Sequence, residues 1–361
     1  MIYITGRAMR GTEASLAMSD MNIRPINHRV TDRPMVDSFG RQITYVRISV
    51  TDRCDLRCRY CMAEKMIFLP RADILSLEEI VELSDILIGR GVRKIRLTGG
   101  EPLVRKGVEH LFKELGRRIG GGLDEFVLTT NGTQLERFAP ILRDAGMRRV
   151  NVSLDSLDAG RFAHITRRGD LAQVLRGIAA AAAAGLSVKI NMVALKGLNN
   201  DEIVSMLRWC GARGYDLTLI ETMPLGEVEE ARIDHYLPLS DVKADLEREF
   251  RLIPSLARSG GPARYWEVED LGVRLGLITP LTQNFCDGCN RIRIAATGTV
   301  YGCLGHDQKV ELRDVLRLEG RHGVDRLLGE LLKGKPRRHD FRIGAGTSVP
   351  AVERHMSVTG G

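Results

Sequence analysis

The cysteine spacing near the front of this 361-residue chain constrains it more than any other feature. Cys54, Cys58 and Cys61 form C-x3-C-x2-C, with Tyr60 directly before the last cysteine. Iron–sulfur clusters are normally held by four cysteine thiolates, whereas zinc sites usually show paired C-x2-C units. The spacing predicts a four-iron cluster held by three thiolates, with one iron open to a ligand that chelates through an amine and a carboxylate. A zinc knuckle or three unrelated thiols is the competing interpretation.

A second set of three cysteines lies far downstream. Cys286 and Cys289 form C-x2-C, and Cys303 follows after thirteen further residues. One interpretation is a structural zinc site with His306 as the fourth ligand, because Cys and His at such spacing are common zinc ligands. The other is a second iron–sulfur cluster, whose open iron could bind substrate. The remaining cysteine, Cys210, lies in a stretch with helical periodicity and is predicted to be a buried core thiol.

Composition predicts a globular cytoplasmic protein. No apolar run reaches membrane-spanning length, the N-terminus lacks a signal-peptide pattern, and the cysteine pattern fits a reducing compartment better than a disulfide framework. The formal charge is +7, but aromatic residues make up only 5% and do not interleave with a basic block, which disfavours nucleic acid. Arginine forks match phosphate oxygens, so the basic residues inside the motifs predict a dispersed triphosphate site: Arg47, Arg96, Lys189, Arg291 and Arg293.

Strands and helices alternate along most of the chain. A strand from Ile43 to Val50 runs into the first cysteine loop, and a capping box from Ser76 to Glu79 opens a helix that extends to about Gly91. Further strands are predicted at 93–98, 124–130, 147–154, 186–193 and 215–223. Further helices are predicted at about 104–117, 134–145 (where Pro140 should disturb the helix), 171–185, 200–213 and 239–250.

This alternation predicts a parallel α/β sheet of right-handed βαβ units. Periodicity alone permits either an incomplete barrel or an open doubly wound sheet. After about residue 255 the pattern changes to short strands and glycine turns. The predicted organisation is a flexible extension over 1–40, an α/β domain over 41–254 and a smaller C-terminal region over 255–361 that caps the barrel mouth.

Several short motifs accompany the two cysteine sets in a fixed order. They are Thr-Asp-Arg-Cys at 51–54, Arg-Leu-Thr-Gly-Gly-Glu-Pro at 96–102, Thr-Thr-Asn-Gly at 129–132, Asn-Val-Ser-Leu-Asp at 151–155, Cys-Asn-Arg-Ile-Arg at 289–293 and a terminal Gly-Gly. From about Gln42 to the end, the chain resembles the GTP 3',8-cyclases, radical-SAM lyases of the first step of molybdenum cofactor biosynthesis. S-adenosylmethionine (SAM) is the amine and carboxylate ligand of the open iron in such enzymes.

The resemblance implies an incomplete TIM-like (β/α)6 barrel that converts GTP to (8S)-3',8-cyclo-7,8-dihydroguanosine 5'-triphosphate with SAM and two 4Fe-4S clusters. It implies SAM contacts at Tyr60, Gly100, Ser153 and Met223. It implies GTP contacts at Arg47, Arg96, Thr129, Lys189, Arg291, Ile292 and Arg293. Period two also places Arg291 and Arg293 on one face of a strand. Catalytic roles are implied for Arg291, Arg293, Gly360 and Gly361, the two glycines reaching into the active site.

The expected partners follow from the same resemblance. They are GTP, a downstream cyclic pyranopterin monophosphate synthase, an electron donor of the flavodoxin or ferredoxin type and a second copy of the chain in a homodimer, with no nucleic acid and no membrane. The nearest alternative is a radical-SAM peptide-modifying maturase, although such enzymes usually carry more downstream cysteines. A zinc-stabilised scaffold without catalysis is the alternative from another class.

Overall fold

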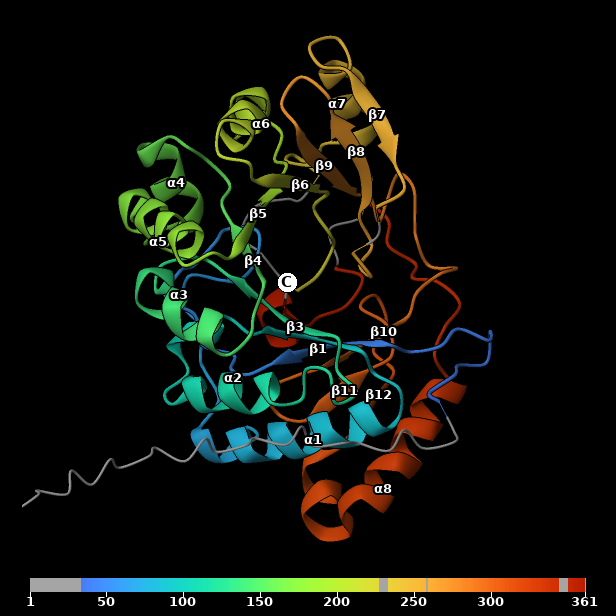
Figure 1. Ribbon diagram of the computed structural model, residues 1–361. Coiled ribbons are helices and arrows are strands. Elements are labelled where there is room, and N and C mark those ends of the chain that lie inside the picture. The colour runs from blue at the N-terminus through green and yellow to red at the C-terminus, as the bar shows by residue number, and fades with distance from the viewer. Residues whose placement is uncertain (1–33, 227–232, 258, 344–349, 361) are drawn as a thin grey trace, which may run out of the picture.

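One twelve-stranded sheet organises the protein, in the order β12-β11-β10-β1-β2-β3-β4-β5-β6-β9-β8-β7 (Figure 1). The computed structural model describes residues 34–226, 233–257, 259–343 and 350–360. Most of the predicted N-terminal extension therefore lies outside the described residues. Its last part is packed, because Met35 is fully buried in the core and Val36 forms a β-bridge with Gln42.

The first six strands are adjacent in chain order and parallel, as the βαβ alternation predicts. They are β1 (Tyr45–Ser49), β2 (Lys94–Thr98), β3 (Glu125–Thr130), β4 (Arg149–Ser153), β5 (Ser187–Val193) and β6 (Asp216–Ile220). Consecutive parallel strands with helical crossovers form an incomplete barrel rather than a doubly wound sheet, in which the strand order would reverse. The predicted barrel is confirmed.

Helices cross over between these strands on the outside of the sheet (Figure 1). They are α1 (Leu77–Gly89), α2 (Val108–Gly116), α3 (Leu135–Asp144), α4 (Ala159–Thr166), α5 (Leu171–Ala183) and α6 (Ile203–Gly211). The capping box of α1 is confirmed: Ser76 Oγ accepts from Glu79 N at 3.1 Å, and Glu79 Oε2 accepts from Ser76 N at 2.7 Å. Within the described part of the chain, no helix is both long and apolar enough to cross a membrane.

The C-terminal part of the chain extends the same sheet at both edges. It contains α7 (Leu239–Leu246), β7 (Leu252–Ser255), β8 (Arg264–Val268), β9 (Val273–Ile278), β10 (Arg291–Ile294), β11 (Thr299–Tyr301), β12 (Lys309–Glu311), α8 (Arg313–Lys333) and α9 (Met356–Thr359). Strand β9 pairs in parallel with β6, and β10 pairs in parallel with β1. Strands from both sides of the predicted boundary at residue 255 are therefore hydrogen-bonded in one sheet. The division into domains there stays a prediction.

Three local features differ from the sequence prediction. Helix α3 continues through Pro140. Proline lacks the N–H that would bond the carbonyl four residues earlier, but Pro140 is on the exposed side of the helix, while Phe138 and Leu142 are on its buried side. The short helix α4 was not predicted; Asp158 caps it by accepting from Arg161 N at 2.7 Å. Helix α8 was also missed, because a non-helical Gly320 with φ 58° divides it and interrupts its apolar periodicity.

Side-chain alternation decides which residues face the inside of the barrel. Asn191 and Val193 of β5 line an interior cavity, so Lys189 on the same strand points inward as well. Pairing of β10, β1 and β2 then aligns Arg293 with Arg47, and Arg47 with Arg96. Aligned residues of parallel strands point to the same face, so this interior carries a row of three arginines.

Candidate active site

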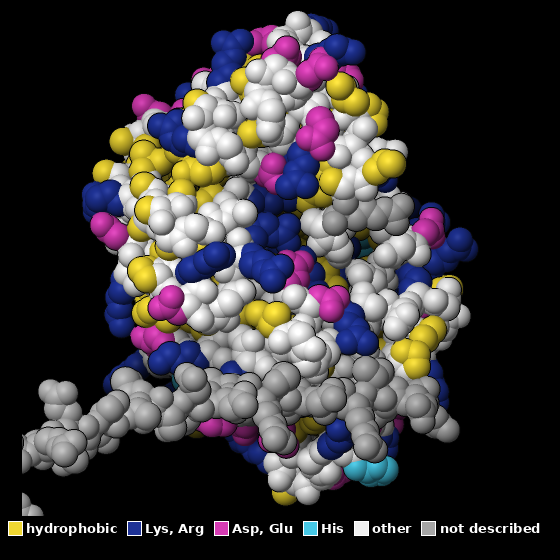
Figure 2. Space-filling model, viewed as in Figure 1, with side chains coloured by type: hydrophobic (Ala, Val, Ile, Leu, Met, Phe, Trp, Pro, Cys, Tyr) yellow, Lys and Arg dark blue, Asp and Glu magenta, His cyan; other side chains and the backbone are white. Residues whose placement is uncertain are grey.

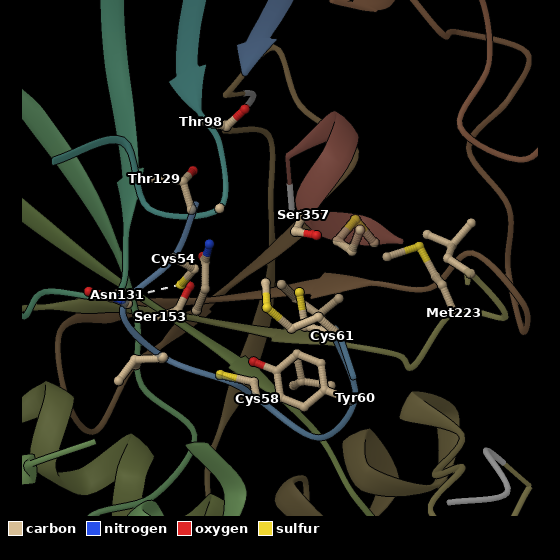
Figure 3. A pocket seen from close by; sticks show the side chains of 18 of the residues that line it. Cys54, Cys58, Tyr60, Cys61, Thr98, Thr129, Asn131, Ser153, Met223 and Ser357 are labelled. Carbon is tan, nitrogen blue, oxygen red and sulfur yellow. Dashed lines mark hydrogen bonds between the residues drawn. The ribbon is translucent and has the colours of Figure 1, made fainter. Parts of the chain in front are cut away.

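The first three cysteines lie in the loop that follows β1. Cys54, Cys58 and Cys61 all line one cavity inside the barrel (Figure 3). Cys61 N donates to Cys58 O at 2.9 Å, which folds the loop into a turn. Arg57 N and Arg59 N donate to the last residues of α4 at 3.0 Å each. The helix missed in the sequence thus fixes the cysteine loop from outside.

Two glycines let the next loop pack against the cysteine loop. A Cβ on Gly100 would lie 2.3 Å from Arg53 O, and one on Gly99 would lie 2.7 Å from Thr51 O. The backbones instead bond directly, with Gly100 N donating to Thr51 O at 2.8 Å. Glycine permits this approach because it lacks a side chain. Gly100 also lines the cavity beside the cysteines.

Glu101 holds the third loop in place. Its fully buried carboxylate accepts from Thr130 Oγ1 at 2.8 Å and from Asn131 N at 2.7 Å. Burial raises the pKa of Glu101 to about 8. Asn131 Nδ2 in turn donates to Asp55 Oδ1 at 2.6 Å and contacts Cys54 Sγ at 3.8 Å. The loops after β1, β2 and β3 are therefore one hydrogen-bonded unit around Cys54.

Asp155 plays a similar part on the other side of the cavity. Tyr60 Oη donates to Asp155 Oδ2 at 2.7 Å, and Val193 N donates to Asp155 Oδ1 at 2.8 Å. Burial raises the pKa of Asp155 to about 6 and, together with the Asp155 charge, raises the pKa of Cys58 well above its ordinary value. The predicted motifs contained Glu101 and Asp155, but their structural roles were missed. The available signal was a carboxylate one to three residues after the end of a predicted inner strand.

The four predicted SAM residues come together with the first cysteine set. Tyr60, Gly100, Ser153 and Met223 all line the same cavity as the three thiols. In Figure 3, Tyr60 lies beside Cys58, and Met223 lies on the far side of Cys61. Three thiols on one cavity, beside hydroxyl and main-chain groups, form a donor set that fits a four-iron cluster with a chelating ligand on its open iron. The individual contacts stay predictions.

The second three cysteines also meet at one cavity. Cys286 and Cys289 lie in the loop before β10, and Cys303 follows β11. Burial raises the pKa of Cys289, but the Arg291 and Lys335 cations outweigh it and lower that pKa to about 7. Lys335 Nζ contacts Cys289 Sγ at 3.7 Å. Lys335 is a site residue that sequence reasoning missed, since it lies 46 residues from the cysteine that it contacts.

The two cavities share a wall. Ile220, Met223 and Met356 line both of them. The second cavity is also lined by Arg47, Arg291 and Arg293. A ligand in the second cavity would therefore lie directly beside a ligand in the first.

Cations gather on the inner face of the sheet next to the second cavity. Arg96 donates to Tyr45 Oη at 2.5 Å and to Thr129 Oγ1 at 2.7 Å. Burial, followed by the Arg47 and Arg291 charges, lowers the pKa of Arg293 well below its ordinary range. Cations crowded together in a buried place favour an anionic ligand. Figure 2 shows Lys and Arg side chains in the hollow at the middle of the viewed face.

Lys189 lies further along the same inner face. It is buried, donates to Tyr265 Oη and lies 4.3 Å from the centre of that ring. Burial, followed by the Arg149 charge, lowers the pKa of Lys189 to about 7. Lys189 therefore points into the barrel, while its contact with phosphate stays a prediction.

The C-terminal tail ends inside the barrel, where α9 is the short red helix at the centre of Figure 1. Arg293 Nη1 donates to Gly360 O at 2.7 Å. Gly360 has a φ of 73°, and a Cβ there would lie 1.9 Å from Thr98 Oγ1, so only glycine fits. Gly361 lies outside the described residues.

Two residues considered in the sequence lie away from the cavities. The Ile292 side chain is in the hydrophobic core, so only its main chain can face a ligand. His306 Nε2 is within hydrogen-bond distance of Arg338 O, at 3.0 Å, and His306 does not line the second cavity. Among the described residues, no three His, Cys, Asp or Glu side chains converge closely enough to hold one metal ion.

Comparison with known proteins agrees with this site. The profile of the Radical SAM superfamily matches residues 48–210, and the profile described as Molybdenum Cofactor Synthesis C matches residues 215–341. The fold and the three-cysteine loop define a radical SAM protein, a class that uses a 4Fe-4S cluster and SAM.

Closer relatives place the chain within that class. It is 56% identical to a GTP 3',8-cyclase of Rhizobium meliloti (strain 1021), over 96% of this chain and 99% of the relative. It is also 56% identical to a GTP 3',8-cyclase of Rhizobium etli (strain CIAT 652), over 91% of this chain and 94% of the relative. The chain belongs to the GTP 3',8-cyclase family.

Solved structures support the fold alone. The crystal structure of Streptococcus suis SuiB bound to S-adenosylmethionine superposes with a TM-score of 0.54 at 14% identity. The match covers 76% of this chain and 63% of that one. Identity this low carries no information about substrate, whereas the relatives at 56% identity are GTP 3',8-cyclases, so the peptide-modifying alternative is not favoured.

Proposed function

We propose that the protein converts GTP to (8S)-3',8-cyclo-7,8-dihydroguanosine 5'-triphosphate by binding SAM and GTP in the two adjoining cavities. The observation that carries this assignment is the shared wall of Ile220, Met223 and Met356 between one three-cysteine cavity and another that arginines line. A SAM molecule bound on one side of that wall would lie next to a nucleotide bound on the other side.

Each cavity has its own task in this proposal. Cys54, Cys58 and Cys61 hold the first cluster, and Tyr60, Gly100, Ser153 and Met223 surround SAM. With its cluster bound, this site supplies the 5'-deoxyadenosyl radical that abstracts the ribose 3' hydrogen of GTP. Buried walls exclude water from the reacting atoms, which suppresses side reactions of a reactive radical.

Arginines in and beside the second cavity bind and orient the nucleotide. Arg47, Arg96 and Arg293 are aligned across three strands, so their guanidinium groups can engage several phosphate oxygens at once. Thr129 and Lys189 extend this surface along the inner face. Fixing the triphosphate holds the ribose and guanine in one geometry, which favours closure of the ring between C3' and C8.

We further propose that Cys286, Cys289 and Cys303 hold a second 4Fe-4S cluster with an open iron toward the substrate. The donor set fits, because three thiols line the cavity and the Cys289 pKa is lowered to about 7, which favours the thiolate that binds metal. Gly360 lies at this site, and we propose a catalytic role for it and for Gly361, which lies outside the described residues. Arg293 binds Gly360 O and so links the tail to the nucleotide surface.

The remaining assignments concern the cellular setting. We propose that the protein is a cytoplasmic homodimer. Each chain would consist of an N-terminal extension (1–40), a barrel domain (41–254) and a C-terminal region (255–361). A flavodoxin or ferredoxin would donate the electrons, and a cyclic pyranopterin monophosphate synthase would take the product. These assignments are supported by the family to which the chain belongs.

Anaerobic reconstitution tests the proposal. Iron and sulfide are measured per chain, and the protein is then incubated with dithionite, SAM and GTP before product analysis. About eight irons, GTP-dependent 5'-deoxyadenosine and a cyclised guanosine triphosphate are expected. About four irons would overturn the second cluster, and SAM cleavage that is indifferent to GTP would overturn the substrate.

A further inference from the structure

Arg354, which no motif includes, joins the C-terminal tail to the loop of Cys303. Its Nη2 donates to the main-chain oxygens of Cys303 at 3.2 Å, Leu304 at 2.5 Å and His306 at 2.8 Å. Its Nη1 pairs with Asp307 at 2.5 Å. The guanidinium lies 4.2 Å from the centre of the Tyr301 ring, and the side chain is 8% exposed.

The tail around Arg354 is docked along its length. Ala351 N donates to Pro224 O, and Gly226 N donates to Val352 O, both at 2.9 Å, which pairs the tail with the segment after β6. Val352 is buried in a small apolar cluster with Leu225 and Phe341, and Leu304 and Met356 pack against it. The tail and the Cys303 loop therefore share one small core that is separate from the main core.

The residues after Arg354 form part of both cavities. Met356 lines both, and Ser357 lines the first beside Cys61. Gly360 O accepts from Arg293 at 2.7 Å. A shift of the tail at residue 354 would therefore change the wall between the cavities.

We propose that Arg354 is a positioning residue that couples the conformation of the Cys303 loop to the placement of the C-terminal tail in the active site. When the loop has its cluster-binding conformation, its three carbonyl oxygens converge, and the Arg354 guanidinium donates hydrogen bonds to all of them. When the loop opens, those acceptors separate and the tail loses its anchor. Arginine suits this task because its planar fork carries several donors, whereas lysine carries a single ammonium group.

The coupling works in both directions. Because coupling free energies are reciprocal, a cluster that fixes the Cys303 loop would also stabilise the docked tail, and a docked tail would stabilise the loop. A chain with an unformed second site would then also lack an ordered wall beside the first. This part of the inference rests on the proposed second cluster, but the contact between tail and loop does not.

Hydrogen–deuterium exchange on the anaerobically reconstituted full-length protein tests the coupling. Exchange is followed in segments 298–308, 350–360 and 54–62 for the unsubstituted protein, Arg354→Gln and Arg354→Lys. We expect Arg354→Gln to accelerate exchange by at least about tenfold in both 298–308 and 350–360 but not in 54–62. Arg354→Lys should act in the same direction with a smaller effect, because it retains the charge beside Asp307.

Arg342→Gln is the matched control, since it removes an exposed arginine from the same end of the chain. Accelerated exchange in only one of the two segments, or an equal effect of Arg342→Gln, would overturn the coupling. Iron analysis separates this inference from the proposed function. If the unsubstituted protein holds about four irons but Arg354→Gln accelerates exchange in both segments, the second cluster is contradicted and the coupling is supported. If it holds about eight irons but the two segments respond separately, the second cluster is supported and the coupling is contradicted.

Discussion

The two three-cysteine sites are built in opposite ways. The first is local: Cys54, Cys58 and Cys61 lie in one loop after one strand. Carboxylates surround it, and burial and the Asp155 charge raise the pKa of Cys58. The second is assembled from two segments on either side of β10 and β11, and cations surround it. There the Arg291 and Lys335 charges lower the pKa of Cys289 to about 7.

This difference indicates which site depends more on distant residues for its conformation. The first loop is held by short-range turns and by neighbouring βα loops, so its shape follows from the barrel itself. The second is held by side chains from distant parts of the chain: Arg41 donates to Cys286 O at 2.8 Å, and Arg354 donates to Cys303 O at 3.2 Å. The second site should therefore be the easier one to damage from a distance.

Removing one cysteine from each site should give the largest and most clearly separated effects. Cys58→Ala should abolish all SAM cleavage, whereas Cys289→Ala should keep SAM cleavage and lose the cyclised product. Each should lower iron from about eight to about four per chain. Cys210→Ala is the control, because Cys210 is buried in the main core away from both cavities. Loss of SAM cleavage in Cys289→Ala would contradict the proposal that the two three-cysteine sites have separate tasks.

Replacing the two arginines of β10 should affect only the second site. Arg291→Ala with Arg293→Ala should weaken GTP binding by at least about 100-fold, because charge-assisted hydrogen bonds contribute roughly 1.5–3 kcal/mol each. At GTP concentrations high enough to saturate the variant, SAM cleavage should remain. Equilibrium binding of GTP measures the first effect and 5'-deoxyadenosine formation the second. Unchanged GTP affinity would contradict the assignment of these arginines.

Arg41 tests whether a distant residue holds the second site. Its side chain pairs with buried Asp37 at 2.6 Å and donates to the carbonyls of Cys286, Pro336 and Arg337. Arg41→Gln should reduce the free energy of unfolding by about 3 kcal/mol, because it leaves a buried carboxylate unpaired. It should also lower iron at the second site.

Arg118→Gln provides the matched comparison for Arg41. Arg118 is equally buried and pairs with Asp85 of α1, but it lies away from both cavities. It should also destabilise the protein, as thermal unfolding would show, but by less, because Asp85 is 30% exposed whereas Asp37 is fully buried, and it should leave the iron content unchanged. Equal iron loss in the two variants would mean that stability alone explains the Arg41 effect.

The smallest expected effect is an uptake of protons when GTP binds. Burial lowers the pKa of Lys189 to about 7, so Lys189 is mostly neutral at pH 8. Burial would raise the pKa of Tyr45, but the charges of Arg96, Arg47 and Lys94 outweigh it and lower that pKa to about 7. A triphosphate raises both pKa values, since it favours the protonated forms.

Binding at pH 8 should therefore take up about one proton or more, and the uptake should disappear below about pH 6, where both groups are already protonated. Calorimetry in two buffers of different ionisation enthalpy measures it. Lys189→Met should reduce the uptake, whereas Lys243→Met on the outer helix α7 should leave it unchanged. Proton release on binding would contradict this placement of the phosphates.

Much of the fold could be predicted because it repeats a local rule. Each strand from β1 to β6 shows an apolar run between turn residues, and the structure places each within a few residues of the prediction. The α1 cap and the shared face of Arg291 and Arg293 follow from hydrogen bonding and period two in the same way. Helix α8 was missed because Gly320 divides its pattern, and local periodicity cannot bridge such a break.

The sequence by itself determined the chemistry: two sets of three thiols, the arginines near them and the alternation that makes a parallel barrel. Only the tertiary structure decided how the sets combine. It placed β10 beside β1, which aligns Arg293 with Arg47, and it brought Met356 of the tail between the two cavities. The reason is physical. Ligand type and strand period are properties of neighbouring residues, whereas a shared wall depends on contacts between segments more than a hundred residues apart, for which no local pattern exists.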